Sequence, residues 1–169
     1  MTLRPPAGMS LRPALPRDAA ELADLFRAGI EELAQDDYAP EQRAAWAAAA
    51  DDLPVFSARL AAGVTLVAVS GERIAGFATL KGNDTVDLLY THPDFARKGV
   101  ATFLCNALET LAQGRKSTHL KVDASDTAQL FFARRGYVPV QRNTVSAGDE
   151  WLANTSMRKE LAAAEGGVQ

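Results

Sequence analysis

The stretch Asp87-Leu-Leu-Tyr-Thr-His-Pro-Asp-Phe-Ala-Arg-Lys-Gly-Val-Ala101 joins a strand to a helix, and the fold depends on this join. Residues 85–92 are rich in β-branched and apolar side chains, which favours a strand. After Gly99, apolar residues recur at helical spacing as far as Leu111, so one face of a helix is buried. Gly114 suits the end of that helix.

The start of this helix is a candidate anion site. A helix amino terminus leaves about four N–H groups without partners, and its dipole adds roughly half a positive charge. Gly99 and Ala101 are small enough for a phosphate to approach the backbone, and Arg97 and Lys98 add cationic side chains. The alternative is a helix that simply begins with basic residues.

Further elements extend outward from this join. Asp18 and Glu21 have the spacing of a capping box, which predicts the start of a helix that continues to Leu33. Apolar periodicity and turn residues predict the remaining elements, namely strands over 10–15, 65–69, 74–80, 118–123, 137–145 and 151–159, and helices over 40–50, 55–62 and 126–135. The fold class is therefore α/β (α+β), a mixed sheet that contains a three-strand antiparallel meander and carries helices on both faces.

Composition limits the classes of protein to consider. The 169 residues fit one domain, predicted over 10–161, with flexible tails at 1–9 and 162–169. A net charge of −3 argues against broad phosphate neutralisation, so no nucleic-acid partner is expected. No apolar run reaches the length of about 20 residues that a membrane span needs, so no membrane partner is expected. The single cysteine, Cys105, fits a reducing compartment, and a cytoplasmic location is expected.

Two motifs resemble the GCN5-related N-acetyltransferase (GNAT) family. In that family a strand is followed by V-x-P and then R/Q-x-x-G-x-G/A, which Pro93, Gly99 and Ala101 match, whereas Ala96 stands where Arg or Gln is usual. Residues 128–137 (AQLFFARRGY) resemble the family's A-x-x-L-Y-x-K-x-G-F helix. Two further stretches, 38–46 and 152–159, resemble a bacterial branch whose members are mostly unassigned.

The resemblance implies a site for acetyl-CoA as co-substrate, with no metal. The backbone of Leu89 and Thr91 would pair with the pantetheine like an added strand, which requires the central strands of the sheet to splay apart. The helix from residue 126 would close over the CoA arm. The expected cofactor-binding residues are therefore Leu89, Tyr90, Thr91, Arg97, Lys98, Gly99, Val100, Ala101, Thr102, Ser125, Phe132 and Arg135.

The resemblance also implies direct attack of a primary amine, of a small molecule or a peptide, within a ternary complex. Asp87 is the preferred general base, because a two-residue period places it on the same face as Leu89 and Thr91. Its alternative role is to cap a turn or to pair with a nearby Arg or Lys. Tyr38 and Asp123 are lesser catalytic candidates. Phe132 stands where the family often has a tyrosine as general acid, so that acid is missing.

The cysteine, the tryptophans and the histidines are expected to have no catalytic role. Cys105 is expected to be a small buried residue, and Trp46 and Trp151 are expected to serve packing more than substrate binding. His92 and His119 have no companions at metal-ligand spacing. Because Phe132 replaces the usual acid, a catalytically impaired module that binds or senses acyl-CoA is the alternative function. The sequence leaves a homodimer open and does not identify the acceptor.

Overall fold

The computed structural model describes residues 5–163, which form a seven-stranded sheet with five α-helices and three 3-10 turns. The strands are β1 (Met9–Pro13), β2 (Val64–Ser70), β3 (Arg73–Lys81), β4 (Thr85–Thr91), β5 (His119–Ser125), β6 (Val138–Ala147) and β7 (Glu150–Glu160). The α-helices are α1 (Ala19–Leu33), α2 (Pro40–Ala47), α3 (Leu53–Ala61), α4 (Val100–Gly114) and α5 (Gln129–Arg134). The 3-10 turns are η1 (Pro16–Asp18), η2 (Ala48–Ala50) and η3 (Pro93–Phe95).

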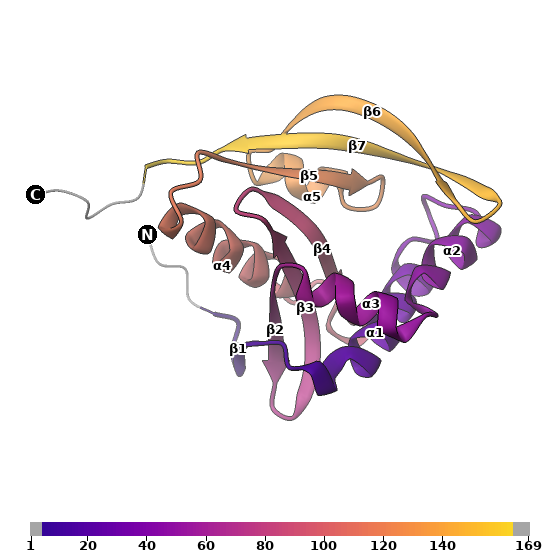
Figure 1. Cartoon of the computed structure of the whole chain (residues 1–169), viewed down its shortest axis with the longest axis horizontal. Coiled ribbons are helices and arrows are strands. Elements are labelled where there is room, and N and C mark those ends of the chain that lie inside the picture. Colours follow the sequence, from indigo (N-terminus) through magenta and orange to yellow (C-terminus); the bar gives the residue numbers. More distant parts are fainter. Residues whose placement is uncertain (1–4, 164–169) are drawn as a thin grey trace, which may run out of the picture.

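The strand order is β1-β2-β3-β4-β5-β7-β6, and β4 and β5 are the parallel pair in an otherwise antiparallel sheet. Their ladder joins Thr85 to Lys121 and Val86 to Val122, and beyond these pairs the two strands separate. In Figure 1, β5, β6 and β7 run across the direction of β2, β3 and β4. The mixed sheet and the meander predicted from the sequence, and the splayed central strands implied by the family resemblance, are confirmed.

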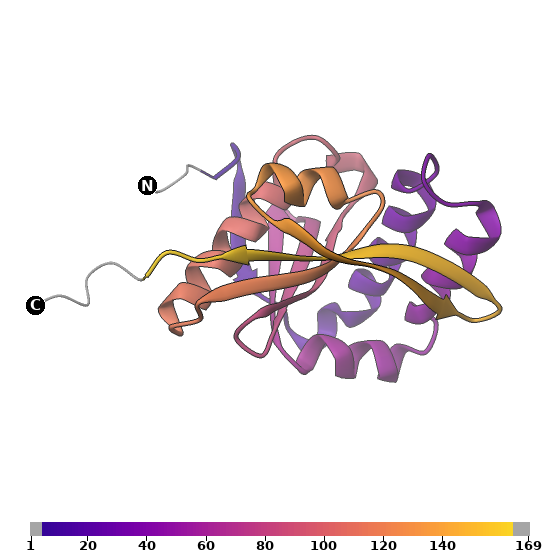
Figure 2. The ribbon, with the colours of Figure 1, turned by 90° about the horizontal axis from the view of Figure 1, so that it is seen from above.

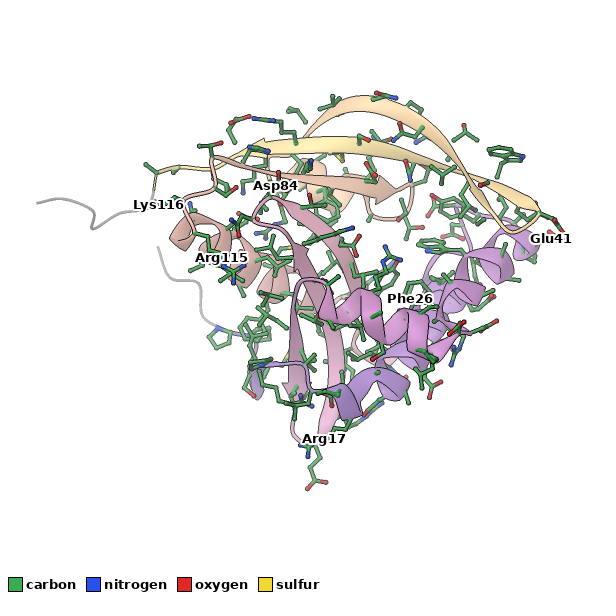
Figure 3. All side chains as sticks on the ribbon, viewed as in Figure 1. Arg17, Phe26, Glu41, Asp84, Arg115 and Lys116 are labelled. Carbon is green, nitrogen blue, oxygen red and sulfur yellow. The ribbon has the colours of Figure 1, made fainter. Side chains whose placement is uncertain are left out.

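Helices cover both faces of the sheet, each over its own hydrophobic cluster. On one face α1 and α3 pack through Phe26 and Phe56 against Phe77 and Leu88. On the other face α4 packs through Leu104 and its neighbours, with Phe132 of α5 in the same cluster. The view from above separates α4 and α5 from α1, α2 and α3 (Figure 2). Phe26, labelled in Figure 3, lies inside the molecule between the helices and the sheet.

The capping box predicted at the start of α1 is wrong. Asp18 holds the N-cap position but makes no cap hydrogen bond with its side chain. Its carboxylate instead accepts bonds from the Arg12 guanidinium (2.7 and 3.0 Å) and from the Leu15 N–H (2.7 Å). A 3-10 turn, η1, precedes the helix, so the chain already curves before α1 and the carboxylate is free to bind β1.

The face predicted for Asp87 is also wrong, because β4 contains a bulge. Leu80 pairs with Val86 while Thr79 pairs with Leu88, so Asp87 is an extra residue without a partner on β3. An inserted residue interrupts the two-residue alternation of a strand. Asp87 therefore points toward α3, whereas Leu89 packs against the cluster that α4 covers.

The boundaries of several elements differ from those predicted. The helix expected over 40–50 continues beyond Ala47 as the 3-10 turn η2, and the helix expected over 126–135 is the shorter α5. Met9, assigned to the leading tail, is the first residue of β1, while the remaining tail predictions fall partly on residues 1–4 and 164–169, outside the described residues. Within the described part of the chain, every helix is too short or too polar to cross a membrane.

Candidate active site

A cleft of about 1040 Å³ opens where β4 and β5 separate. Its walls come from both faces of the sheet: Gly29, Leu33 and neighbouring residues of α1 on one side, and Phe131 and Phe132 of α5 on the other. Residues 140–158 of the β6–β7 hairpin contribute a further wall. The splay therefore connects the α4–α5 face to the α1–α3 face through one continuous space.

The start of α4 offers a set of unpaired backbone donors beside this cleft. Within residues 5–163, the N–H groups of residues 97–102 donate to no other protein group. Gly99, the N-cap residue, has a φ of 82°, and Arg97 has a φ of 61°, so two left-handed residues turn the loop into the helix. A row of such amides at a helix start suits a phosphate, and the predicted anion site stays a prediction. Neither Arg97 nor Lys98 forms an ion pair within the described chain.

A glycine on β3 positions this helix start, and the sequence analysis missed it. A Cβ on Gly76 would lie 2.6 Å from Cγ1 of Val100 and 2.8 Å from the carbonyl oxygen of Tyr90. Only a residue without a side chain therefore lets the first turn of α4 lie directly on β3 and β4. A glycine inside a strand often marks such a close approach, which is the signal that could have found it.

The structure brings half of the expected cofactor residues to the cleft. Its lining includes Leu89, Tyr90, Thr91, Ala101, Ser125 and Phe132. Arg97, Lys98, Gly99, Val100 and Thr102 lie at the adjoining helix start rather than in the cleft lining. Arg135 lies elsewhere: its guanidinium donates to Glu109 (2.6 Å) and Asn106 (2.8 Å) on α4.

Phe132 and Cys105 are buried in the hydrophobic cluster that α4 covers, and Phe132 also reaches the cleft lining. Phe132 is buried and packs edge-on against Tyr137, with ring centroids 5.0 Å apart. Cys105 is buried as predicted, and burial raises the pKa of its thiol to about 12, so it is not a nucleophile at neutral pH. The hydroxyl of Tyr137 is buried without a hydrogen-bond partner in the described chain, and it does not line the cleft.

Asp87 lines the cleft but is held by an arginine that the sequence analysis did not single out. Arg59 Nε lies 3.0 Å from Oδ2 of Asp87 and its Nη2 lies 3.2 Å from Oδ1. Both carboxylate oxygens therefore accept hydrogen bonds from the guanidinium, which is the alternative role weighed for this residue. The predicted role of Asp87 as general base stays a prediction. The two residues are 28 positions apart, so no local pattern announces the pair.

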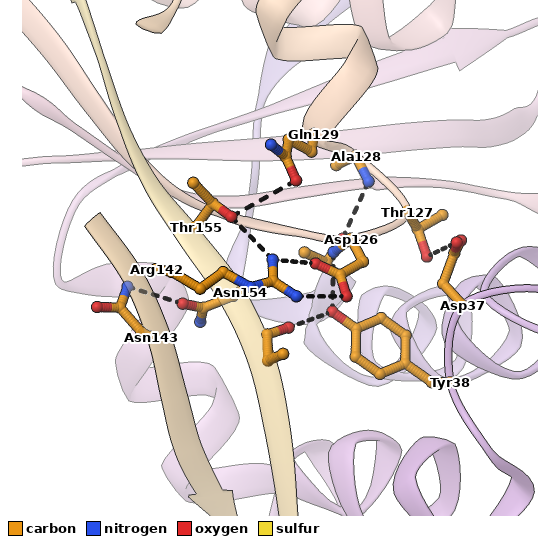
Figure 4. A network of polar contacts seen from close by, with 12 residues as sticks. Asp37, Tyr38, Asp126, Thr127, Ala128, Gln129, Arg142, Asn143, Asn154 and Thr155 are labelled. Carbon is orange, nitrogen blue, oxygen red and sulfur yellow. Dashed lines mark hydrogen bonds and ion pairs between the residues drawn. The ribbon is translucent and has the colours of Figure 1, made fainter. Parts of the chain in front are cut away.

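Tyr38 joins the α1–α2 loop to β7 and to the turn between β5 and α5 (Figure 4). Its hydroxyl donates to the carbonyl oxygen of Ala153 on β7 (2.6 Å) and accepts from the N–H of Asp126 (2.8 Å). Asp126 is in turn held by Arg142 of β6, with Nη2 2.9 Å from Oδ2. These contacts give Tyr38 a structural role, and its predicted catalytic role stays a prediction.

The third catalytic candidate, Asp123, lines the cleft from β5. Its Oδ1 accepts a hydrogen bond from the Ser156 hydroxyl of β7 (2.6 Å). Asn154 and Ser156 line the cleft beside it, and Asn143 of β6 donates to both. The strands predicted over 137–145 and 151–159 contain these side chains, and their polar alternation was the signal that could have singled them out. Among the described residues, no group of three or more His, Cys, Asp and Glu side chains could hold a metal ion.

Comparison with known proteins agrees with this geometry. The model of the acetyltransferase (GNAT) domain matches residues 34–161. The chain is 30% identical over 150 residues to the uncharacterised N-acetyltransferase YafP of Escherichia coli (strain K12), with 89% of this chain and 95% of that protein covered.

Solved structures show the same fold. A GCN5-related N-acetyltransferase from Rhodopseudomonas palustris, which is also named as a class-II aminotransferase, is 52% identical, with a TM-score of 0.90 over 95% of this chain and 100% of that one. The PaiA N-acetyltransferase of Thermoplasma acidophilum, in complex with coenzyme A, has a TM-score of 0.73 at 14% identity over 90% of this chain and 98% of that one, a likeness of fold. With its splayed sheet, its helix start and these relatives, the chain belongs to the GCN5-related N-acetyltransferase (GNAT) family.

Proposed function

We propose that this protein transfers an acetyl group from acetyl-CoA to a primary amine by direct attack in a ternary complex. The observation that carries the proposal is that the amides at the start of α4 and the unpaired edge of β4 lie at the same cleft. The amides of residues 97–102, which have no partner within residues 5–163, lie beside the cleft, and β4 has no strand partner toward β5 after Val86 in the same part of the chain. One feature suits an anion and the other suits an extended chain, and CoA has both a pyrophosphate and a pantetheine arm.

The residues present fit this cofactor. The amides at the start of α4 would hold the pyrophosphate, with Arg97 and Lys98 as nearby cations. The backbone of Leu89 and Thr91 would pair with the pantetheine as an added strand. Ala124 and Ser125 of β5 line the opposite side of the splay, and Phe131 and Phe132 would cover the arm from α5. Bound acetyl-CoA supplies an activated acetyl group on a thioester.

The chain's own groups would then orient the acceptor and exclude water. An exposed backbone N–H on β4 can polarise the thioester carbonyl, as oxyanion donors do. Phe132 cannot donate a proton, so water would protonate the leaving thiolate, which is tolerable because a thiol pKa of roughly 8.5 makes it a fair leaving group. A cytoplasmic location belongs to the same proposal and is supported by the lone, buried cysteine.

Two measurements on the purified protein test the proposal. Calorimetry should detect acetyl-CoA binding, and a thiol assay should detect CoA release that depends on an added amine. Release that needs no amine would indicate hydrolysis instead. Binding without amine-dependent release would favour the alternative, a catalytically impaired module that binds or senses acyl-CoA.

A further inference from the structure

Three aromatic side chains, Tyr38, Trp46 and Tyr90, line the cleft on the side of α1 and α2, and we call them the aromatic wall. Tyr38 and Trp46 meet edge-on with centroids 5.4 Å apart, and Trp46 meets Tyr90 in the same way at 6.3 Å. Tyr90 is backed by Phe77, stacked at 5.7 Å, and by Phe26 at 4.5 Å. Because the core supports these rings from behind, the wall is a rigid apolar surface and loses little entropy when a flat molecule binds.

The aromatic wall lies next to the expected position of the thioester. Tyr90 stands between Leu89 and Thr91, whose backbone is expected to pair with the pantetheine. Leu89 packs toward the α4 cluster and Tyr90 toward the α1 cluster, so the cofactor and the acceptor would approach the splay from opposite faces. Ile30, Leu33 and Leu152 add apolar side chains around the wall. An acceptor bound there would place its reacting group close to β4.

On the side of the aromatic wall, the titratable groups that line the cleft offer no unpaired proton acceptor within residues 5–163. Burial raises the pKa of Tyr90 to about 12 and also raises the pKa of Tyr38, so both phenols stay protonated near neutral pH. Asp87 is bonded through both oxygens to Arg59. Asp123 lies on β5, across the splay from Tyr90, and one of its oxygens, Oδ1, accepts from Ser156.

The remaining charged groups of the lining are cations, Lys121 on β5 and Arg158 on β7. Within residues 5–163, no His, Cys or Glu lines the cleft. An alkyl amine, with a pKa of roughly 10.4 like that of lysine, would arrive as an ammonium ion and would need a base.

We propose, on the basis of the acetyl transfer proposed above, that the acceptor is an aromatic amine, with its amino group attached directly to a flat ring that packs on the aromatic wall. The ring delocalises the nitrogen lone pair and so lowers the pKa of the ammonium form. Such an amine is therefore neutral near pH 7 and needs no base before attack. Its nitrogen forms the new bond to the thioester carbonyl carbon while the carbon–sulfur bond breaks. The thiolate leaves with the electron pair, and the proton lost by the nitrogen passes through water to that thiolate.

Three amines of similar size test separately whether the acceptor needs an aromatic ring and whether it needs a neutral nitrogen. Aniline has the ring and a neutral nitrogen, benzylamine has the ring and a protonated nitrogen, and cyclohexylamine has neither. At pH 7, kcat/KM for aniline should exceed that for benzylamine by about tenfold or more, and should change little with pH between about 6 and 9. The rate with benzylamine should instead rise steeply with pH, as its neutral fraction grows.

The outcomes distinguish this inference from the proposed function. If benzylamine or cyclohexylamine is acetylated at pH 7 as fast as aniline or faster, the aromatic acceptor is wrong while amine acetylation stands. If acetyl-CoA binds in calorimetry but none of the three amines releases CoA, both proposals fail.

Substitution of the wall gives an independent test. Trp46→Ala should raise KM for aniline about tenfold, equivalent to about 1.4 kcal/mol, and Trp46→Phe should restore most of the loss. Trp151→Ala is the matched control, because Trp151 is 62% exposed and does not line the cleft. Calorimetry of acetyl-CoA should give the same affinity for all three variants, which shows that each is folded. Equal KM values for Trp46→Ala and Trp151→Ala would overturn the binding surface.

Discussion

Gly99 is the residue at which backbone conformation and the expected phosphate contact coincide. Its φ of 82° is strained for any residue with a side chain, and most so for a β-branched one. Gly99→Val should therefore displace the amides of the α4 start and weaken acetyl-CoA binding at least about tenfold in calorimetry.

Gly71 provides the matched control for this substitution. It has a φ of 61° in the β2–β3 turn, and a Cβ there would meet no atom within 4 Å. Gly71→Val should share the backbone strain without changing acetyl-CoA affinity. Equal affinities for the two variants would place the pyrophosphate elsewhere.

Substitution of Asp87 distinguishes an amine that needs a general base from an amine that arrives neutral. A positioned general base contributes about 10²-fold or more, so Asp87→Asn would cost at least that much if Asp87 removed the proton from the amine. Because Arg59 occupies both carboxylate oxygens and an aromatic amine arrives neutral, we expect kcat with aniline to fall less than about tenfold. A loss of about 10²-fold that disappears at high pH would instead identify Asp87 as the base.

Single residues show where sequence reasoning succeeds and where it fails. Gly99 and Ala101 could be assigned to the helix start because the motif is local and its chemistry belongs to the backbone. The face of Asp87 could not be predicted, since one inserted residue in β4 reverses the alternation and the hydrophobic pattern does not reveal where the insertion occurs. Its partner Arg59 belongs to another element, so only the tertiary fold brings the two together.

At the scale of elements, Tyr38 ties the α1–α2 loop to β7 and to the β5–α5 turn. Tyr38→Phe removes a hydroxyl that makes one bond as donor and one as acceptor, and leaves two backbone groups without that partner. We expect the free energy of unfolding to fall by about 1–3 kcal/mol in chemical denaturation.

Tyr137→Phe is the matched control, because that buried hydroxyl has no partner among the described residues. Removing it should leave stability unchanged or raise it. If Tyr38→Phe were as stable as Tyr137→Phe, the hydrogen bonds of Tyr38 would contribute nothing to joining these elements.

The junction between β1 and α1 depends on an ion pair whose strength should vary with pH. Arg12 and the Leu15 N–H stabilise the charged form of Asp18 and hold its pKa below its ordinary value. A lowered pKa contributes stability above the unfolded pKa of about 3.9, and that contribution is lost as pH falls through the folded value. Asp18→Asn should therefore cost about 1–3 kcal/mol at pH 7 and progressively less below about pH 4.

Asp24→Asn is the appropriate comparison in the same denaturation series. Its carboxylate is 76% exposed and pairs with Arg27 at the surface. Asp24→Asn should therefore change the free energy of unfolding little, both at pH 7 and below about pH 4. A cost for Asp18→Asn that does not depend on pH would show that the buried side chain matters through packing, and not through its charge.

The order of elements could be predicted from the sequence, but the angle between the two halves of the sheet could not. Apolar periodicity and turn residues located each strand and helix to within a few residues. The splay was expected only from the family resemblance. Its physical cause is tertiary: the β4–β5 ladder ends after Val86, and Tyr38 and the β6–β7 hairpin hold the separated strands from the far side. No local pattern encodes such a separation.

At the scale of the whole molecule, the net charge predicts that duplex DNA does not bind, whereas the start of α4 predicts that the phosphates of acetyl-CoA do. The chain carries 18 Lys and Arg against 21 Asp and Glu, so its long-range field repels a duplex. The start of α4 nevertheless combines free amides with Arg97 and Lys98, which form no ion pair within the described chain. The protein should therefore bind one compact anion at that place and show no affinity for DNA.

Salt titration tests this contrast. Raising ionic strength from about 0.05 M to about 0.5 M should weaken acetyl-CoA binding about three- to tenfold, because the Debye length shrinks from roughly 14 to 4 Å and screens the two cations. Replacing Arg97 and Lys98 with Gln should reduce that dependence, whereas Arg17→Gln, in the turn η1, should not. Duplex DNA should not bind at micromolar protein in physiological salt. Micromolar DNA binding that Arg97 and Lys98 control would mean that these residues form a general polyanion surface rather than a pyrophosphate site.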